Sequence, residues 1–275
     1  MAGDVDGARA LLEQGADAYF DDSRALRRAA EHGHAECVKL LIPASDPLAY
    51  ESHALQLAAH KGHVDCLKLL IPVSNALSNA SLALCWAAER GQAECVKVLI
   101  PVSNPREADF PPLSRAARNG HPECVKLLIP VSDPLADDSL ALRCAAKNGH
   151  AECVKWLIPA SNPLDANSEA LLFAAGGDDS ACARLFAPFY AATTRARDIL
   201  VTAVDNGCPA TVFFLLGIQP FRDQCNLSAI LDKFQGGQHQ ATIAALAAFM
   251  DAEALAETAP VATLTVPKGC ISPRL

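Results

Sequence analysis

Hydrophobic and polar positions predict a pair of short helices near the start of the chain. Between residues 26 and 32, the apolar Leu26, Ala29 and Ala30 are spaced i, i+3 and i+4, which is the spacing of one helical face. Gly33 follows, and glycine is the residue that most readily adopts the left-handed conformation in which many helices end. The pattern therefore predicts a first helix that buries one face and ends at Gly33.

A second short helix is predicted directly after this glycine. Its apolar residues include Cys37, Val38 and Leu41. Pro43 ends it, because a proline disfavours helical geometry in the residue before it. Residues 44–47 read Ala-Ser-Asp-Pro, which is typical of a turn.

This helix pair recurs with a period of 29 residues. The same step separates the glycines Gly33, Gly62, Gly91, Gly120 and Gly149, the cysteines Cys37, Cys66, Cys95, Cys124 and Cys153, and the prolines Pro43, Pro72, Pro101, Pro130 and Pro159. Repeats of this kind indicate a solenoid, in which each copy buries its hydrophobic face against its neighbours.

The repeats divide the chain into four parts. Five regular copies occupy residues 25–169, and residues 1–24 correspond to a partial, capping repeat. Residues 170–250 are expected to hold divergent repeats and a C-terminal cap, and residues 251–275 a flexible tail without clear periodicity. Eight of the ten Phe lie beyond residue 170, which favours a bulkier core there over a dedicated groove for a partner.

The repeat resembles a known family. Residues 142–158 read Leu-Arg-Cys-Ala-Ala-Lys-Asn-Gly-His-Ala-Glu-Cys-Val-Lys-Trp-Leu-Ile, which is similar to the ankyrin pattern Leu-His-x-Ala-Ala-x-x-Gly-His-x-x-x-Val-x-x-Leu-Leu. The resemblance covers roughly residues 3 to 220 and implies an all-α solenoid of stacked helix-turn-helix repeats. Because the family's usual period is about 33 residues, we expect the β-hairpin loops between repeats to be shortened or absent.

Composition narrows the class of protein. The chain of 275 residues is 51% hydrophobic and carries a formal net charge of −8, which argues against disorder and against nucleic-acid binding by the whole surface. An odd number of cysteines, eleven, without a leader-like start indicates a reducing, intracellular and cytoplasmic location. No stretch is apolar enough for a membrane span, and we expect a monomer.

Histidine and cysteine recur together at i, i+3, which raises the possibility of metal binding. The pairs are His34/Cys37, His63/Cys66, His121/Cys124 and His150/Cys153. Zinc ligands lie about 2.0–2.3 Å from the metal in a roughly tetrahedral arrangement. Helices that pack about 8–10 Å apart cannot bring two such pairs to one zinc ion. We therefore expect Cys to fill the core, His to hydrogen-bond the turn, and no metal or cofactor.

Catalytic motifs are not recognisable in the chain. Cys208 and Cys225 are isolated thiols outside any family signature, and phosphate-binding loops, nucleophile elbows and zinc helices are missing from the sequence. We expect a non-catalytic protein. Only the C-terminal third, where the repeats diverge, leaves room for an enzymatic segment.

Charge is segregated by position within the repeat. In the five copies, the expected exposed positions of the first helices carry eight basic and two acidic side chains, a net charge of +6, whereas the six connecting loops carry −10. If the ankyrin resemblance holds, those first helices line the inner, concave face. The candidate partner-binding residues are Arg27, Arg28, His60, Lys61, Trp86, Arg90, Arg115, Arg118, Arg143 and Lys147.

Trp86 stands out among these candidates, because tryptophan and arginine often anchor protein interfaces. The sequence is equally consistent with Trp86 as a half-buried packing residue. Trp156 stands at a second-helix position otherwise held by Leu or Val, and we expect it in the core. The leading hypothesis is a protein-binding scaffold for a partner with an acidic surface. The alternatives are an adaptor that carries a C-terminal docking or enzymatic segment, and nucleic-acid binding through the basic strip.

Overall fold

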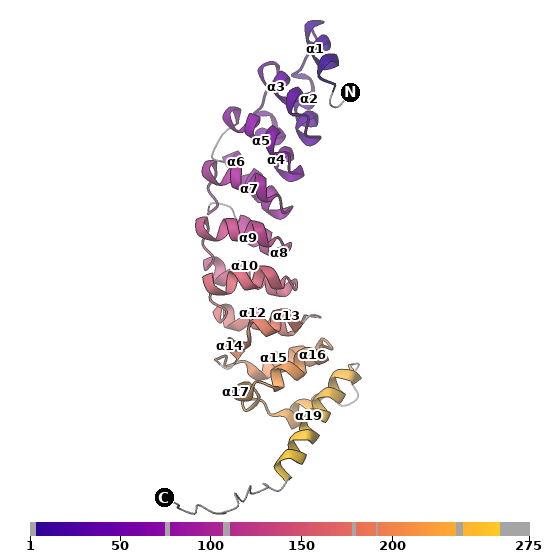
Figure 1. Cartoon of the computed structure of the whole chain (residues 1–275), viewed down its shortest axis with the longest axis vertical. Coiled ribbons are helices and arrows are strands. Elements are labelled where there is room, and N and C mark those ends of the chain that lie inside the picture. The colour runs from indigo at the N-terminus through magenta and orange to yellow at the C-terminus, as the bar shows by residue number, and fades with distance from the viewer. Residues whose placement is uncertain are drawn as a thin grey trace, which may run out of the picture.

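The helices stack into an elongated solenoid, with α1 (Val5–Glu13) at one end and α19 (Gln240–Thr258) at the other (Figure 1). The computed structural model describes residues 4–74, 78–106, 111–177, 180–190, 192–234 and 239–258. Each regular copy contributes one first helix, and neighbouring first helices pack side by side in one row. This row consists of α2 (Phe20–Glu31), α4 (Ala49–Lys61), α6 (Ser78–Glu89), α8 (Pro112–Arg118), α10 (Ala136–Lys147) and α12 (Asp165–Ala175).

The second helices form another row, which packs against the first. They are α3 (Ala35–Leu41), α5 (Val64–Leu70), α7 (Ala93–Leu99), α9 (Pro122–Leu128), α11 (Ala151–Leu157) and α13 (Ser180–Leu185). Each contacts the first helix of its own repeat and the second helix of the next, and α1 (Val5–Glu13) contacts α3 at the N-terminal end of the row. The predicted partial repeat in residues 1–24 thus supplies a second helix to the stack.

Short turns replace the β-hairpins of the ankyrin pattern. No strand occurs in the described parts of the chain, and each second helix of the five regular copies runs into a 3-10 turn. These turns are η1 (Ile42–Ala44), η2 (Ile71–Val73), η3 (Ile100–Val102), η4 (Ile129–Val131) and η5 (Ile158–Ala160). The prediction of shortened or absent hairpin loops is confirmed.

A left-handed turn precedes the regular part of several first helices. Residues 21–23, 50–52 and 137–139 have φ between 49° and 61°, a conformation that costs L-amino acids about 1–2 kcal/mol per residue. The next loop holds the turn in place, because the Ser23 hydroxyl accepts a hydrogen bond from the backbone N–H of Asp46 at 2.7 Å. The Ser81 and Ser139 hydroxyls accept the equivalent bond from the backbone N–H groups of Asn104 and Asn162, both at 3.0 Å, so three loops are tied to the loop of the following repeat.

Glycine and histidine join consecutive repeats at the other end of the first helices. The glycines that end these helices have φ between 71° and 84°: Gly33, Gly62, Gly91, Gly120 and Gly149. His150 packs so closely on Gly120 that a Cβ there would lie 2.6 Å from its Nδ1, and its Nε2 donates to the carbonyl oxygen of Arg118 at 2.9 Å. His63 and His121 make the same bond at 3.0 Å. The predicted role of these histidines in the turn is confirmed, and the turn belongs to the preceding repeat.

The core lies between the two rows of helices. Leu and the Ala pair of each first helix face the Cys, Val and Leu of the second helices. Cys66, Cys95, Cys124 and Cys153 are at most 1% exposed, and burial raises the pKa of the Cys124 thiol to about 11. Cysteine therefore acts as a small buried hydrophobic residue, as predicted.

Divergent helices continue the stack beyond α13. They are α14 (Ala187–Tyr190), α15 (Ala196–Asp205), α16 (Pro209–Leu216), α17 (Gln219–Arg222), α18 (Leu227–Phe234) and α19 (Gln240–Thr258). Phe186, Tyr190 and Phe221 are fully buried, and the Tyr190 and Phe221 rings meet edge to face at 5.6 Å. The aromatic residues of this region thus fill a bulkier core, although Phe213 remains 49% exposed.

The end of the chain is described only in part. α19 packs against α16 and α18, so the C-terminal helices follow the stack (Figure 1). The boundary predicted between residues 250 and 251 falls inside α19. Residues 259–275 of the predicted tail lie outside the described residues.

Candidate protein-binding face

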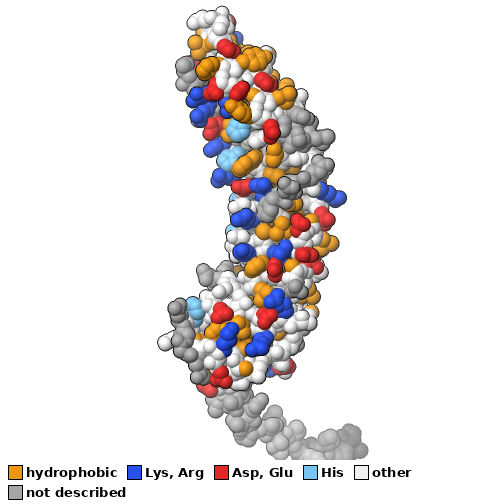
Figure 2. Space-filling model, turned by 180° about the vertical axis from the view of Figure 1, so that it is seen from behind, with side chains coloured by type: hydrophobic (Ala, Val, Ile, Leu, Met, Phe, Trp, Pro, Cys, Tyr) orange, Lys and Arg blue, Asp and Glu red, His pale blue; other side chains and the backbone are white. Residues whose placement is uncertain are grey.

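The row of first helices brings the ten candidate residues together. All lie on α2, α4, α6, α8 or α10, except Arg90, which directly follows α6. We call these residues the first-helix face: Arg27, Arg28, His60, Lys61, Trp86, Arg90, Arg115, Arg118, Arg143 and Lys147. In Figure 2, basic and histidine side chains follow one edge of the upper half of the stack, with acidic side chains among them. The positive charge of this face is therefore partly paired within the molecule.

Arg27 and Arg143 stabilise the loops. Their side chains are only 20% and 21% exposed. Arg27 Nη2 donates to the carbonyl oxygen of Asp21 at 2.7 Å, and Arg143 Nη2 donates to that of Asp137 at 2.8 Å. Arg143 Nη1 also pairs with Glu169 Oε2 at 2.5 Å. These contacts hold the left-handed turns, so both arginines have roles within the fold.

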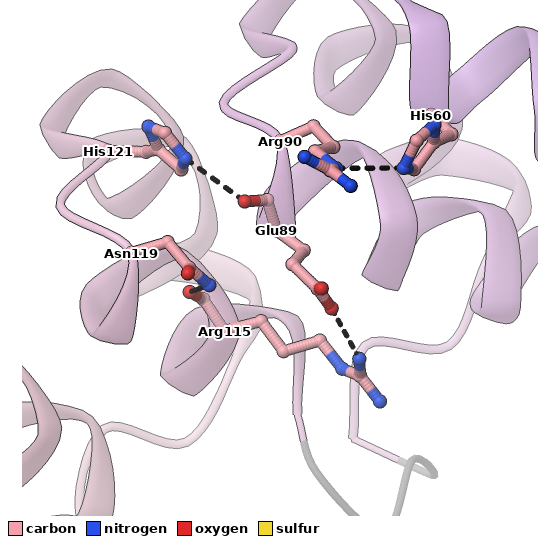
Figure 3. Close-up of polar contacts among 6 residues, drawn as sticks. All are labelled: His60, Glu89, Arg90, Arg115, Asn119 and His121. Carbon is pink, nitrogen blue, oxygen red and sulfur yellow. Dashed lines mark hydrogen bonds and ion pairs between the residues drawn. The ribbon is translucent and has the colours of Figure 1, made fainter.

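Glu89 connects α6 to the next repeat through two bonds (Figure 3). Its Oε2 accepts from Arg115 Nη1 at 2.7 Å, and its backbone carbonyl accepts from His121 Nε2 at 3.0 Å. The Arg115 and Glu89 side chains are 29% and 31% exposed, so solvent screens this pair less than a fully exposed one. The Arg115 carbonyl accepts in turn from Asn119 Nδ2 at 2.9 Å. Arg115 is therefore part of the contact between repeats.

His60, Trp86 and Arg90 form a cluster between α4 and α6. Arg90 Nε donates to His60 Nε2 at 2.7 Å (Figure 3), which requires a neutral imidazole with its proton on Nδ1. The His60 and Trp86 rings meet edge to face, with their centroids 5.5 Å apart. Burial, then the positive charges of Arg90 and Lys61, lower the pKa of His60. The ring is thus predominantly neutral at pH 7.

A shallow pocket of about 160 Å³ lies beside this cluster. It is lined by His53, Gln56, Leu57, His60 and Trp86. Sites for small molecules usually have roughly 300–1,000 Å³, so this pocket suits a single side chain of a protein partner better than a cofactor. His53 is not among the residues predicted from the sequence, although its spacing from His60 places both on one helical face.

Five basic side chains of the first-helix face are exposed. They are those of Arg28, Lys61, Arg90, Arg118 and Lys147. Arg28 pairs with Glu31 at 2.9 Å while remaining 59% exposed. The Lys147 ammonium lies 5.5 Å from the centroid of the Phe173 ring. The exposed positive charge near the His60–Trp86 pair therefore comes from Arg90 and Lys61, and Arg118 adds another exposed cation on α8.

Three sequence-based expectations about exposure were wrong. Cys85 and Ser114 occupy first-helix positions that the repeat pattern predicts to be exposed, but they are 3% and 4% exposed. Cys85 lies beneath the Arg115 side chain of the next repeat, which hydrogen-bonds it. Trp156 was expected in the core and is 42% exposed. The smaller residues at its position in the other copies are only half-buried, so the indole extends into solvent, where the Lys126 ammonium lies 4.7 Å from its ring.

Side chains that could support metal binding or nucleophilic catalysis are used otherwise. Within the described ranges, no group of three or more His, Cys, Asp or Glu side chains is arranged to hold a metal ion. Cys208 is buried, and its thiol donates to the carbonyl oxygen of Gly177 at 3.2 Å. Burial raises the pKa of Cys225 to about 11, which disfavours the reactive thiolate. No described helix combines the length and apolar character that crossing a membrane requires.

Comparison with known proteins decides the family. The sequence profile described as ankyrin repeats (three copies) matches residues 1–81, 26–110, 55–138, 84–170 and 142–228, which together span most of the chain. The chain belongs to the ankyrin repeat family. Ankyrin repeats are in general protein–protein interaction modules and are typically non-catalytic. No curated protein matches the chain.

Solved ankyrin structures share this architecture. The crystal structure of the human ASB11 ankyrin repeat domain is 23% identical, with a TM-score of 0.53, over 60% of this chain and 82% of that one. The ankyrin repeat domain of Bcl-3, described as a unique member of the IkappaB family, is 19% identical, with a TM-score of 0.49, over 66% and 91%. At this identity, the ASB11 likeness supports the solenoid fold alone.

Proposed function

We propose that this ankyrin repeat protein is a non-catalytic scaffold that binds a protein partner through its first-helix face, which we expect to be the concave one. The observation that carries the proposal is the pocket beside Trp86. Trp86 is 37% exposed, borders a cavity of about 160 Å³, and has the exposed Arg90 next to it. A partly exposed tryptophan beside arginine is a common arrangement at energetic hot spots.

Charge defines the partner chemistry of this proposal. Arg90 hydrogen-bonds His60 at the pocket, Lys61 directly follows His60, and Arg118 lies on α8 of the same face. A partner should therefore offer an apolar side chain for the pocket and carboxylates for these exposed cations. Because His60 is neutral at pH 7, it contributes shape and hydrogen bonding, not charge. A protein with an acidic surface fits this face better than a nucleic acid, since the chain carries a formal net charge of −8.

The test uses exposed residues, because Arg115 is tied to Glu89 and its replacement would disturb the fold. The partner is first isolated by affinity capture with the wild-type protein and identified by mass spectrometry. The purified partner is then titrated against Trp86→Ala combined with Arg118→Glu. We expect its Kd to rise by at least about ten-fold, the size of a hot-spot loss.

A matched control changes charge on the second helices of the same stack. Lys97→Glu combined with Lys155→Glu alters two exposed lysines, 52% and 60% exposed, on α7 and α11. This control should retain wild-type affinity. Equal weakening by both double variants, or unchanged binding by Trp86→Ala with Arg118→Glu, would contradict the assignment of the first-helix face.

A further inference from the structure

Four large apolar side chains project from the first two loops at the N-terminal end. Tyr19, Phe20, Leu48 and Tyr50 are 59%, 71%, 50% and 60% exposed. They lie far from the pocket at Trp86 in sequence and are not part of the first-helix face. We call them, together with Asp17, Asp21, Asp22, Asp46 and Glu51, the N-terminal edge.

Contacts between the two loops make this edge continuous. The Asp22 carboxylate of the preceding repeat interacts with the Tyr50 hydroxyl and raises the pKa of Tyr50. The Arg27 guanidinium lies 4.8 Å from the centroid of the Tyr50 ring while it bonds the Asp21 carbonyl. Tyr50 thus rests on the turn that directly follows Phe20.

Carboxylates also fix the backbone at Tyr19 and Leu48. Asp17 Oδ1 accepts from the backbone N–H of Tyr19, and Asp46 Oδ1 accepts from that of Leu48, both at 2.9 Å. The backbone that presents each side chain is therefore fixed. Acidic groups consequently surround the apolar ones.

The charge of this edge is opposite to that of the first-helix face. Loop residues 15–24 and 44–53 each carry a net charge of −2. Arg24 is the exposed cation that compensates part of it, pairing with Asp21 at 3.3 Å. An acidic surface repels anionic lipid and nucleic acid, and it attracts cationic protein segments.

The turn at the start of α10 shows that the fold does not require these aromatic residues. There, residues 137–139 form the same left-handed turn, with Asp137 at the position of Tyr50 and Ala136 at that of Phe20. Asp137 and Asp138 retain the acidic character, and Leu135 is 55% exposed. The aromatic side chains of the first two loops are therefore an addition to the repeat. Clustered exposed apolar groups of this kind are typical of binding sites.

We propose that the N-terminal edge docks a basic protein segment in which apolar side chains alternate with Lys or Arg. The apolar side chains of the segment cover Phe20 and Tyr50, and its cations meet Asp21, Asp22 and Glu51. This second surface would let the scaffold hold two partners of opposite charge.

Fluorescence anisotropy with a labelled short peptide in which Leu and Lys alternate tests the proposal. Phe20→Ala combined with Tyr50→Ala should weaken binding by at least about ten-fold. Leu135→Ala with Phe213→Ala, which removes two exposed side chains elsewhere, should leave it within about two-fold. Helical content and thermal unfolding of every variant are compared by circular dichroism, so that loss of folding is recognised.

Charge gives a second, matched comparison. Asp21→Asn with Asp22→Asn should weaken binding of the Leu/Lys peptide. Asp137→Asn with Asp138→Asn makes the same change in the equivalent turn at the start of α10 and should leave the binding unchanged. Raising the salt from about 0.05 to about 0.5 M should weaken binding, because exposed charges are screened. A control peptide that alternates Leu and Glu should not bind.

Three results would overturn the proposal. The first is an equal loss of peptide affinity in the two Asp→Asn double variants. The second is peptide binding that is unchanged by Phe20→Ala with Tyr50→Ala. The third is sedimentation with phosphatidylcholine vesicles that depends on Phe20, without peptide binding. The variants that test the N-terminal edge differ from those that test the first-helix face. Arg27, which contacts both surfaces, is left unchanged in all of them. The outcome is therefore independent of the test of the proposed function.

Discussion

The two rows of helices differ in which residues stay constant from copy to copy. The second helices repeat nearly the same sequence, with Cys, Val and Leu buried and Lys paired to an acidic residue three positions earlier, as in Glu94–Lys97 and Glu152–Lys155. The first helices keep the buried Leu and Ala pair but vary at every exposed position. Constant residues thus build the stack, and variable residues give each repeat its own surface.

Core truncation in a second helix should produce the largest effect. Leu128 on α9 is fully buried between the two rows, so Leu128→Ala should lower the free energy of unfolding by about 2–5 kcal/mol. Leu57→Ala, at a half-exposed position of α4, should cost much less. Urea denaturation followed by circular dichroism measures both. Similar losses of unfolding free energy for the two variants would contradict the distinction between a constant row that builds the stack and a variable row that forms the surface.

Two glycines separate backbone conformation from packing between repeats. Gly149→Ala meets no other atom within 4 Å, so its cost should be that of a left-handed alanine, about 1–2 kcal/mol. Gly120→Ala should cost more, because its Cβ would displace His150 from the carbonyl of Arg118. Thermal unfolding of both variants is the measurement. Equal destabilisation would show that the histidine contact contributes nothing.

The smallest effect is expected from pH. Because the pKa of His60 is lowered in the folded state, the unfolded chain binds more protons just below the usual value of about 6.5. The stability that this group contributes is present above that pH and is lost as the pH falls toward the folded pKa. Protonation also prevents Nε2 from accepting from Arg90.

His60→Gln provides the reference for this effect. The difference in unfolding midpoint between wild type and variant should shrink as the pH is lowered from about 8 to about 5, because only the wild type carries the imidazole of His60. A difference that stays constant over this range would show that the Arg90–His60 bond does not depend on protonation.

Exposure was the property that the sequence analysis predicted least well. Helical periodicity located the Ala pairs and the Cys column correctly, because those positions follow from one helix alone. Cys85 was misassigned because Arg115 of the next repeat interacts with it, and Trp156 because its position is only half-buried, so the large indole extends into solvent. The charge count likewise found the arginines, but pairing of Arg115 with Glu89 and of Arg143 with Glu169 required the neighbouring helices in place.

The sequence by itself determined the architecture, since a period of 29 residues with fixed apolar, glycine and proline positions permits few arrangements other than stacked helical hairpins. Tertiary structure alone decided which side chains remain available to a partner. Contacts between repeats join residues about 23 to 32 positions apart, and no local pattern reports whether an arginine points to solvent, to a carboxylate or to a turn.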